Sequence, residues 1–181
     1  TRLPLRTFIP YGDSGEYISR PRFIALSEFG PRNMIYHNGG RFQVEQLLFP
    51  DLEKQLTKAK ISRNSGYILM GDEYNCNVCP LTQVPLTSDA EREIVTDLME
   101  MAETCTREEA RISCEEEERL RQGYDIGTYF SVPAGVSTIK MAHVKHDDEL
   151  FLRIRYIQAA RLVKINKRWR SSTEKGFQLG M

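Results

Sequence analysis

The sequence of 181 residues lacks the short motifs of several common enzyme classes. It has no GxxxxGKS/T phosphate loop and no GxGxxG fingerprint, which excludes these two nucleotide-binding turns from the chain. No Ser-His-Asp ordering stands out, and there are only three histidines. We therefore do not expect this chain alone to be an enzyme, and the activity of any larger protein that contains it stays open.

Long apolar runs are also missing. None approaches the roughly 20 residues that a membrane-spanning helix needs, and no secretory signal opens the chain. The four cysteines include one CxxC pair, which indicates a reducing compartment and metal or redox use rather than a disulfide scaffold. We expect a cytoplasmic protein without a membrane partner. The abrupt ends of the chain predict an excised part of a larger protein.

Positive and negative charges cancel overall but are unevenly spread. Residues 1–63 carry 10 Lys and Arg against 6 Asp and Glu, and residues 129–181 carry 10 against 4. Residues 64–128 carry 5 against 15. Basic flanks around an acidic middle are typical of a surface for nucleic acid or an acidic partner. They equally fit regions that neutralise each other inside the fold, and both interpretations stay open.

Most of the chain has the pattern of β-structure. Residues 33–49 predict a hairpin, because Asn38, Gly39 and Gly40 form a turn signal between two β-rich runs. Residues 1–18 contain two prolines and two glycines and predict a linker or lead-in segment. Later β-branched and aromatic runs predict strands at 124–132, 137–144, 149–157 and 160–169.

Helices are expected in two or three places. Residues 20–29 predict a short helical turn or a strand. A capping box at Ser88 and Glu91, followed by apolar residues at helical spacing, predicts a helix over 88–105. A second capping box predicts a helix over 113–122. The predicted fold class is thus α+β, an antiparallel β-rich module with two or three short helices and a degenerate zinc-ribbon-like hairpin.

The most specific chemical signal is Cys76-x-x-Cys79. Two thiolates at this spacing fit one edge of a tetrahedral zinc site, and such pairs usually occur twice. The other two cysteines, Cys105 and Cys114, are too far apart in sequence to form a second such pair. A redox role is also possible in principle, although no thioredoxin-like βαβ pattern surrounds the motif. Three interpretations stay open: zinc held by all four cysteines, no metal, or a redox pair.

Basic and aromatic residues interleave late in the chain, where Tyr156 and Trp169 stand among arginines and lysines. Phosphate binding needs clustered Lys and Arg, and aromatic rings can stack on bases. The alternative is the exposed face of a β-hairpin with Trp169 in the core. Together with two early arginines, the nucleic-acid-binding candidates are Arg20, Arg22, Arg153, Arg155, Arg161, Lys164, Lys167 and Arg168.

Four strings stand in the same order as in one known family. They are "SRPRFIALSEFGPRNMIYHNGGRFQV" (19–44), "AKISRNSGY" (59–67), "RISCEEEERLRQGYDI" (111–126) and "LRIRYIQAARLVKINKRWR" (152–170). From about residue 17 to 177, the chain resembles the cysteine-rich C-terminal domain of unknown function of bacterial superfamily-two DEAD/DEAH-box DNA helicases. Similar members include mitomycin-repair helicases and proteins of the DISARM phage-defence system. We accordingly assign residues 19–181 to this domain, with a ribbon-like insert at about 59–84.

The resemblance implies an accessory domain beside a helicase motor, tied to ATP-driven translocation on DNA. It also implies a four-cysteine zinc site, in which Cys76 and Cys79 match the family's second pair. Ser62 and Ser65 stand where the first pair is expected. The motor's ATP-binding motifs are absent, so ATP belongs to motor domains and this chain alone should not hydrolyse it.

The leading hypothesis is therefore an accessory domain of an ATP-dependent DNA helicase or translocase in bacterial DNA repair or phage defence. Its expected partners are DNA and helicase motor domains, in the same chain or in another. The alternative is a protein-interaction module that docks on a helicase partner in a defence complex without touching DNA. A stand-alone hydrolytic or redox enzyme has little support, because no nucleophile–base pair is visible.

Overall fold

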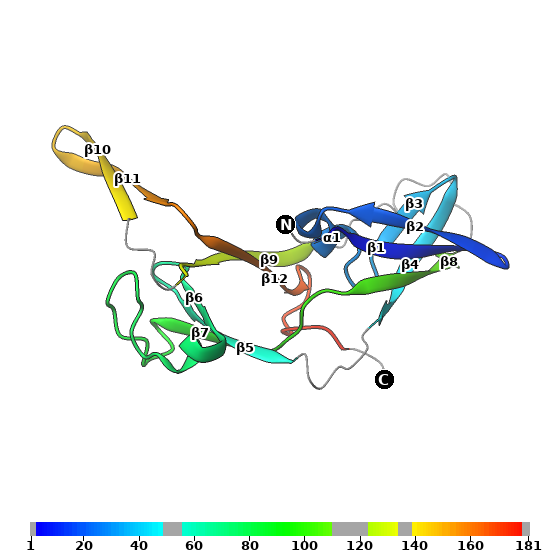
Figure 1. The fold of residues 1–181 in the computed structure, drawn as a ribbon, viewed down its shortest axis with the longest axis horizontal. Coiled ribbons are helices and arrows are strands. Elements are labelled where there is room, and N and C mark those ends of the chain that lie inside the picture. The colour runs from blue at the N-terminus through cyan, green and yellow to red at the C-terminus, as the bar shows by residue number, and fades with distance from the viewer. Residues whose placement is uncertain (1–2, 49–55, 110–122, 134–138, 179–181) are drawn as a thin grey trace. The chain divides into compact units, whose positions relative to one another are not determined.

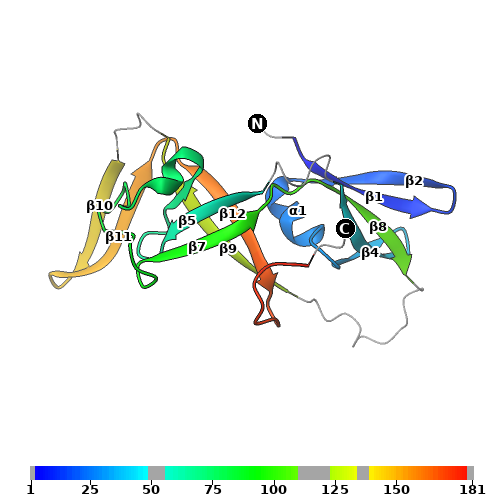
Figure 2. The same ribbon diagram turned by 90° about the horizontal axis from the view of Figure 1, so that it is seen from below.

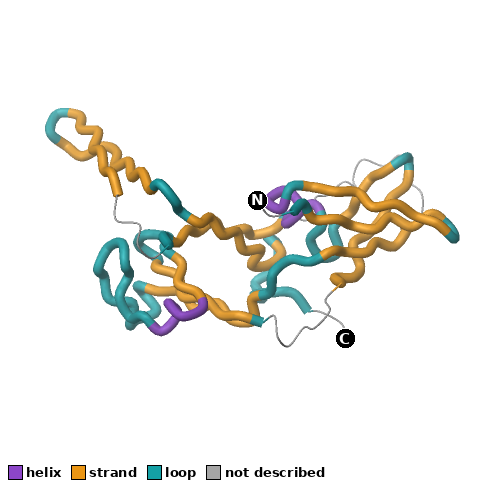
Figure 3. The backbone as a smooth tube through the Cα atoms, viewed as in Figure 1, coloured by secondary structure: helices purple, strands orange, loops and turns teal. Residues whose placement is uncertain are grey.

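The structure is a computed structural model that describes residues 3–48, 56–109, 123–133 and 139–178. Strands make up 58% of it and helices 8%, so the fold is mostly β (Figure 3). The predicted α+β class is therefore wrong. The described part of the chain has one α-helix, α1 (Arg22–Glu28), and one 3-10 turn, η1 (Gly71–Asn75). The helix predicted over 113–122 lies outside the described residues.

The longer predicted helix is replaced by two strands, β7 (Arg92–Leu98) and β8 (Glu103–Glu109). The two residues of the expected capping box do meet, since the Ser88 hydroxyl donates to the Glu91 carboxylate at 3.2 Å. This bond joins two side chains, whereas a capping box joins each side chain to a backbone amide. However, only one turn of backbone hydrogen bonds follows from Ser88. The β-branched residues 94–96 then favour an extended chain, because branching at Cβ restricts side-chain rotation in a helix.

The chain divides into two compact units. Unit 1 consists of Thr1–Leu56, Asp97–Gly127 and Lys164–Met181, and unit 2 consists of Thr57–Thr96 and Thr128–Val163. The ribbon-like segment expected at about 59–84 lies wholly inside unit 2. Unit 2 is larger than that segment, because the late residues of the chain return to it.

Unit 1 contains β8 and four earlier strands, β1 (Leu5–Tyr11), β2 (Ser14–Arg20), β3 (Met34–His37) and β4 (Gly40–Leu48). They form one sheet in the order β2-β1-β8-β4-β3, in which only β1 and β8 pair in parallel (Figure 1). The hairpin predicted over 33–49 is confirmed as β3 and β4 in the described residues. Asn38 and Gly39 take the left-handed backbone of its turn.

Strands β1 and β2 occupy most of the segment that the sequence led us to expect as a linker. They pair along their full length, and the chain turns between them at Gly12, whose φ of +55° is in the left-handed region. Leu5 and Ile9 of β1 are buried. This alternation of buried residues outweighs the local turn signal of Pro4 and Pro10.

The core of unit 1 lies where α1 packs on the curled sheet (Figure 2). The helix contributes Ala25, which is fully buried, and Phe29 follows directly after it. Both belong to one apolar cluster with side chains from β1, β3 and β4. Its buried members are Leu5, Ile9, Ala25, Phe29, Ile35, Phe42 and Val44.

Unit 2 contains a three-stranded sheet in the order β6-β5-β7, where β5 is Thr57–Ser62 and β6 is Ile68–Met70. It also contains an antiparallel hairpin of β10 (Ile139–His146) and β11 (Glu149–Ile157). Two further strands, β9 (Tyr124–Ser131) and β12 (Arg161–Trp169), pair with each other and have residues in both units. The four late runs predicted as strands are thus confirmed in the described residues.

Candidate nucleic-acid interface

The β10–β11 hairpin has two chemically different faces, because directly paired residues point to the same side of a sheet. Arg155 pairs with Met141 and Arg153 pairs with His143, so these side chains share one face. Every residue of β10 is exposed, and so is most of β11. The hairpin therefore presents Arg153 to solvent, with the half-buried Arg155 beside it on the same face. Its opposite face is largely apolar and carries Ala142, Val144, Leu152, Ile154 and Tyr156.

A groove of about 560 Å³ lies at the base of this hairpin, within unit 2. Arg153 and Arg155 line it together with Phe130 and with Tyr156, whose side chain belongs to the opposite face of the hairpin. Neither guanidinium has a hydrogen-bond or carboxylate partner among the described residues. Positive charge is thus available for a bound anion, beside apolar surface. The remaining lining residues are Ser65, Ile157, Ala160 and Leu162.

The wall formed by Phe130 is fixed by buried packing behind it. Its ring meets the ring of Tyr67 edge to face, with the centroids 5.7 Å apart. Tyr67 is only 2% exposed, and its hydroxyl donates to the Val132 carbonyl and accepts from the Val132 amide. The Phe130 amide donates to the Gly66 carbonyl at 3.2 Å. The wall is thus organised before any ligand arrives.

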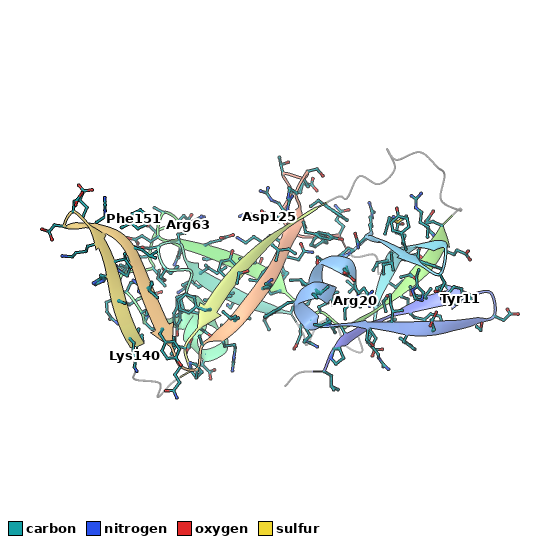
Figure 4. The ribbon with its side chains drawn as sticks, turned by 90° about the horizontal axis from the view of Figure 1, so that it is seen from above. Tyr11, Arg20, Arg63, Asp125, Lys140 and Phe151 are labelled. Carbon is teal, nitrogen blue, oxygen red and sulfur yellow. The ribbon has the colours of Figure 1, made fainter. Side chains whose placement is uncertain are left out.

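Charge changes sign along the hairpin. Lys140 pairs with Tyr156 near the groove, whereas the turn at the other end carries Asp147, Asp148 and Glu149. Figure 4 shows Lys140 near one end of the hairpin and Phe151 near the other. A polyanion is therefore attracted to the groove end and repelled from the turn.

The candidate arginines of unit 1 are differently placed, because each has a carboxylate partner. Arg20 donates to Glu28 and Arg22 donates to Glu100, both at 2.7 Å. Arg168 donates to Asp125 at 3.2 Å. These ion pairs compete with a phosphate for the same guanidinium groups.

The other candidates are distributed over both units. The Lys164 ammonium lies 5.1 Å from the centre of the Phe23 ring, a cation–π contact within unit 1. Lys167 also belongs to unit 1, whereas Arg161 is exposed in unit 2. Trp169, which the sequence placed either with these residues or in the core, stacks on Tyr124 at 4.6 Å between ring centroids. The structure thus brings only Arg153 and Arg155 of the eight candidates into the groove.

The ribbon-like segment of unit 2 is formed by two tight turns. In the first, the Gly66 amide donates to the Ser62 carbonyl, and the Ser62 amide donates to the Tyr67 carbonyl. In the second, the amide of Cys79 donates to the Val84 carbonyl. The Ser65 hydroxyl and the Cys79 sulfur lie 3.4 Å apart and join the two turns by a hydrogen bond. A serine–thiol contact thus stands where the sequence resemblance predicts two zinc-binding cysteines.

The Cys79 thiol is fully buried in an apolar cluster with Tyr67, Leu69 and Leu86. Burial raises the pKa of this thiol. Hydrogen bonds lower the pKa by more than burial raises it; the largest of these contributions is from Ser65, and the others are from groups of residues 81 and 82. The net pKa lies below the ordinary value for cysteine. Cys76, in contrast, is exposed.

A buried lysine fastens the CxxC loop to β5. Lys60 is 4% exposed, and its ammonium donates to the Cys76 carbonyl at 2.8 Å and to the Asn77 side chain at 3.0 Å. The ammonium also lies 5.4 Å from the centre of the Tyr74 ring. Burial lowers the pKa of Lys60, with a further contribution from nearby Arg92. The loop is therefore held by a side chain of the chain itself.

The described residues do not complete a zinc site. Cys76 and Cys79 lie in one loop of unit 2, Cys105 lies in β8 of unit 1, and Cys114 is outside the described residues. Across the described ranges, no three His, Cys, Asp or Glu side chains lie together in a group that could hold a metal. Two thiolates supply half of a tetrahedral zinc site. Zinc thus stays a prediction that requires ligands from elsewhere.

Sequence reasoning missed the two residues that complete the groove, Phe130 and Ser65. They precede Arg153 by more than 20 residues, and no local pattern connects them with it. It also missed Lys60, which looked like one more exposed lysine in a polar stretch. No sequence signal indicates its burial, because Ala59 and Ile61 on either side point to the opposite face of a strand.

Comparison of the chain with protein families, with curated proteins and with solved structures finds no match. Within the described ranges, no helix is long and apolar enough to cross a membrane.

Proposed function

We propose that this chain is an accessory domain of an ATP-dependent DNA helicase or translocase in DNA repair or phage defence, and that it contacts DNA through the groove of unit 2. The observation that carries the DNA contact is the pair of guanidinium groups at Arg153 and Arg155. They lie on one face of the hairpin, without carboxylate partners in the described structure, in a groove that Phe130 also lines. The link to a motor rests on the sequence resemblance.

In this proposal the chain guides DNA and the motor domains supply ATP hydrolysis. Arginines that bind phosphates release counterions, so binding must weaken steeply as salt rises. The ion-paired arginines of unit 1 contribute less, because binding a phosphate requires them to leave a carboxylate. Unit 1 then serves to support the module, and unit 2 provides the contact surface.

The test is fluorescence anisotropy with labelled DNA over a range of salt concentrations. The variant Arg153→Gln/Arg155→Gln removes two phosphate contacts, so we expect weaker binding and a salt dependence shallower by roughly 2 in the log–log slope. The control Arg32→Gln/Lys175→Gln removes the same charge from exposed positions of unit 1. Equal effects of the two double variants, or salt-independent binding by the parent chain, would overturn the proposal.

One observation favours the second function, docking on a helicase partner. The apolar face of the hairpin is open to solvent: Val144, Leu152 and Ile154 are each more than 40% exposed. Exposed apolar surface of this kind often marks a protein contact. A helicase motor that co-purifies after nuclease treatment, and is lost in Ile154→Glu, supports docking. Loss of the motor on nuclease treatment argues against it.

A further inference from the structure

The apolar face of the β10–β11 hairpin, opposite Arg153 and Arg155, carries charges of opposite sign at its two ends. We propose that this face packs on the same face of a second copy of the chain, with the two hairpins running in opposite directions. The arginine face takes no part in this contact. The inference is therefore independent of the DNA contact proposed above.

The apolar face consists of four cross-strand pairs, because directly paired residues of a hairpin point to the same side. From the open end of the hairpin to its turn, the pairs are Lys140 with Tyr156, Ala142 with Ile154, Val144 with Leu152, and His146 with Glu149. The last pair lies beyond a register shift, at which β11 and not β10 has the extra residue. His146 therefore keeps the side of Val144, and Glu149 shares it.

The apolar middle of this face has no covering layer among the described residues. Val144, Leu152 and Ile154 are 43%, 47% and 49% exposed. In the same part of the chain, β10 and β11 form a sheet of two strands. A two-stranded hairpin is marginally stable in water by itself, and a further layer on its apolar face stabilises it. A second hairpin, stacked about 10 Å away, supplies such a layer.

Charge determines which layer fits and in which direction. Lys140 and Glu149 are about 20 Å apart at the rise of a strand, so they cannot meet within one hairpin. Figure 4 shows Lys140 at the end away from the turn.

When a second copy packs in the opposite direction, Lys140 of each copy lies over Glu149 of the other, and the apolar pairs lie over one another. Packing in the same direction places Lys140 over Lys140 and Glu149 over Glu149. The face is thus complementary to itself through a two-fold axis, which is the commonest symmetry of protein dimers.

The contact is small. It uses four residue pairs of each copy, fewer than the roughly 20–30 residues on each side of a standard interface. We therefore expect a weak dimer, with a dissociation constant of roughly 10–100 µM at low salt. A helicase motor that docks on this face has to displace the second copy, so the two contacts exclude each other.

The experiment is sedimentation equilibrium of the chain at low salt, from about 1 to 500 µM, where the parent should pass from monomer to dimer. Lys140→Glu and Glu149→Lys each place like charges over one another. Each variant alone should therefore dimerise at least fivefold more weakly, because two ion pairs are replaced by repulsion. An equimolar mixture of the two variants should recover the parent affinity, since the introduced carboxylate then lies over the introduced ammonium. Refolding within one chain cannot produce recovery on mixing.

Two further variants control the test. Lys145→Glu makes the same charge change on the other side of β10 and should alter dimerisation less than twofold. Ile154→Asn places a polar group in the apolar middle and should abolish the dimer. If Ile154→Asn fails to fold, the mixture of charge variants decides the outcome.

Three results would overturn the inference. The first is a parent chain that stays monomeric over the whole concentration range. The second is a dimer that Lys140→Glu and Glu149→Lys do not weaken, which places the contact on another surface. The third is a mixture that associates no more tightly than the separate variants, which excludes the opposite direction of the two hairpins. The DNA contact is tested separately by Arg153→Gln/Arg155→Gln, and it stands or falls without this dimer.

Discussion

The candidate DNA-binding arginines of the two units have opposite surroundings. In unit 1, Arg20, Arg22 and Arg168 each donate to a carboxylate of the same unit. In unit 2, Arg153 and Arg155 line a groove without such a partner among the described residues. The sequence alone does not distinguish these five arginines as candidates for binding a phosphate. The comparison teaches that charge available for a ligand depends on which carboxylates the fold brings near.

Unit 2 also contains the opposite extreme, a cation that is almost completely buried. The Lys60 ammonium donates hydrogen bonds to two acceptors of the CxxC loop. The same unit thus has one lysine that acts in folding and two arginines that no carboxylate in the described part of the chain neutralises.

The largest effect on stability should come from Lys60→Met. The substitution keeps the volume but leaves the Cys76 carbonyl and the Asn77 side chain without the ammonium, which should cost about 1–3 kcal/mol of unfolding free energy. The control is Lys58→Met. The ammonium of Lys58 lies 4.5 Å from the centre of the same Tyr74 ring but on an exposed residue. Urea unfolding measures both, and equal losses would contradict the role given to Lys60.

The second effect is on stability at alkaline pH. Tyr124 of unit 1 is buried, which raises its pKa above the ordinary value of 10.0, and its hydroxyl donates to the Pro31 carbonyl at 2.8 Å. Since the folded pKa is raised, its contribution is complete below pH 10 and is lost as pH rises toward the folded value. The loss is at most about 1.4 kcal/mol per pH unit.

Tyr124→Phe isolates this contribution. The free-energy difference between the parent chain and the variant should be constant below pH 10 and shrink above it, as measured by urea unfolding at each pH. Lys60 changes the pH dependence of stability in the opposite direction, because its lowered pKa makes the free energy of unfolding rise as pH approaches 10.5. This contribution is the same in the parent chain and in the variant. It therefore cancels in the difference. A difference that stays constant to pH 12 would show that burial of Tyr124 does not matter in this way.

The third prediction removes the carboxylate partners of two arginines of unit 1, so that their surroundings resemble those of Arg153 and Arg155 in unit 2. The variant Glu28→Gln/Glu100→Gln releases Arg20 and Arg22 from their carboxylates. We expect DNA affinity at low salt to rise up to about tenfold and the salt slope to steepen by roughly 2. Asp13→Asn/Glu174→Gln changes the net charge equally at exposed positions and is the control. If both variants gain equally, total charge decides binding and the distinction between the units is wrong.

The smallest effect concerns single arginines. Arg168→Gln breaks a partly exposed ion pair with Asp125 and should cost about 0.2–1 kcal/mol of stability, with DNA affinity unchanged. Arg153→Gln should do the reverse, with unchanged stability and weaker binding. Thermal unfolding and anisotropy on the same preparations check both. Weaker DNA binding by Arg168→Gln would place unit 1 in the interface.

The predictions from sequence succeed where the signal is local. The turn at Asn38 and Gly39 determines its hairpin within a few residues, and alternation over residues 149–157 predicts β11. The helix prediction at 88–105 failed because a capping box and apolar spacing are local. Strand pairing of β7 and β8 depends on distant segments: Thr104 of β8, for example, lies opposite Thr7 of β1.

The candidate site shows the same limit. Arg153 and Arg155 could be named from a basic and aromatic pattern, but the partners of Arg20, Arg22 and Arg168 could not. Glu100, for example, lies 78 residues after Arg22. Phe130 joins the groove because backbone bonds place it beside Gly66, a contact between distant segments of unit 2. No composition or spacing rule contains that information.

The Lys60 contact has a consequence for the conditions under which the ribbon-like loop can form. A metal-held knuckle depends on the supply of the metal and on thiols that stay reduced. The contact between Lys60 and the Cys76 carbonyl forms from groups that every copy of the chain carries, and neither chelators nor oxidants remove it. This attachment of the loop to β5 therefore needs only the chain itself and does not depend on the metal content of the cell.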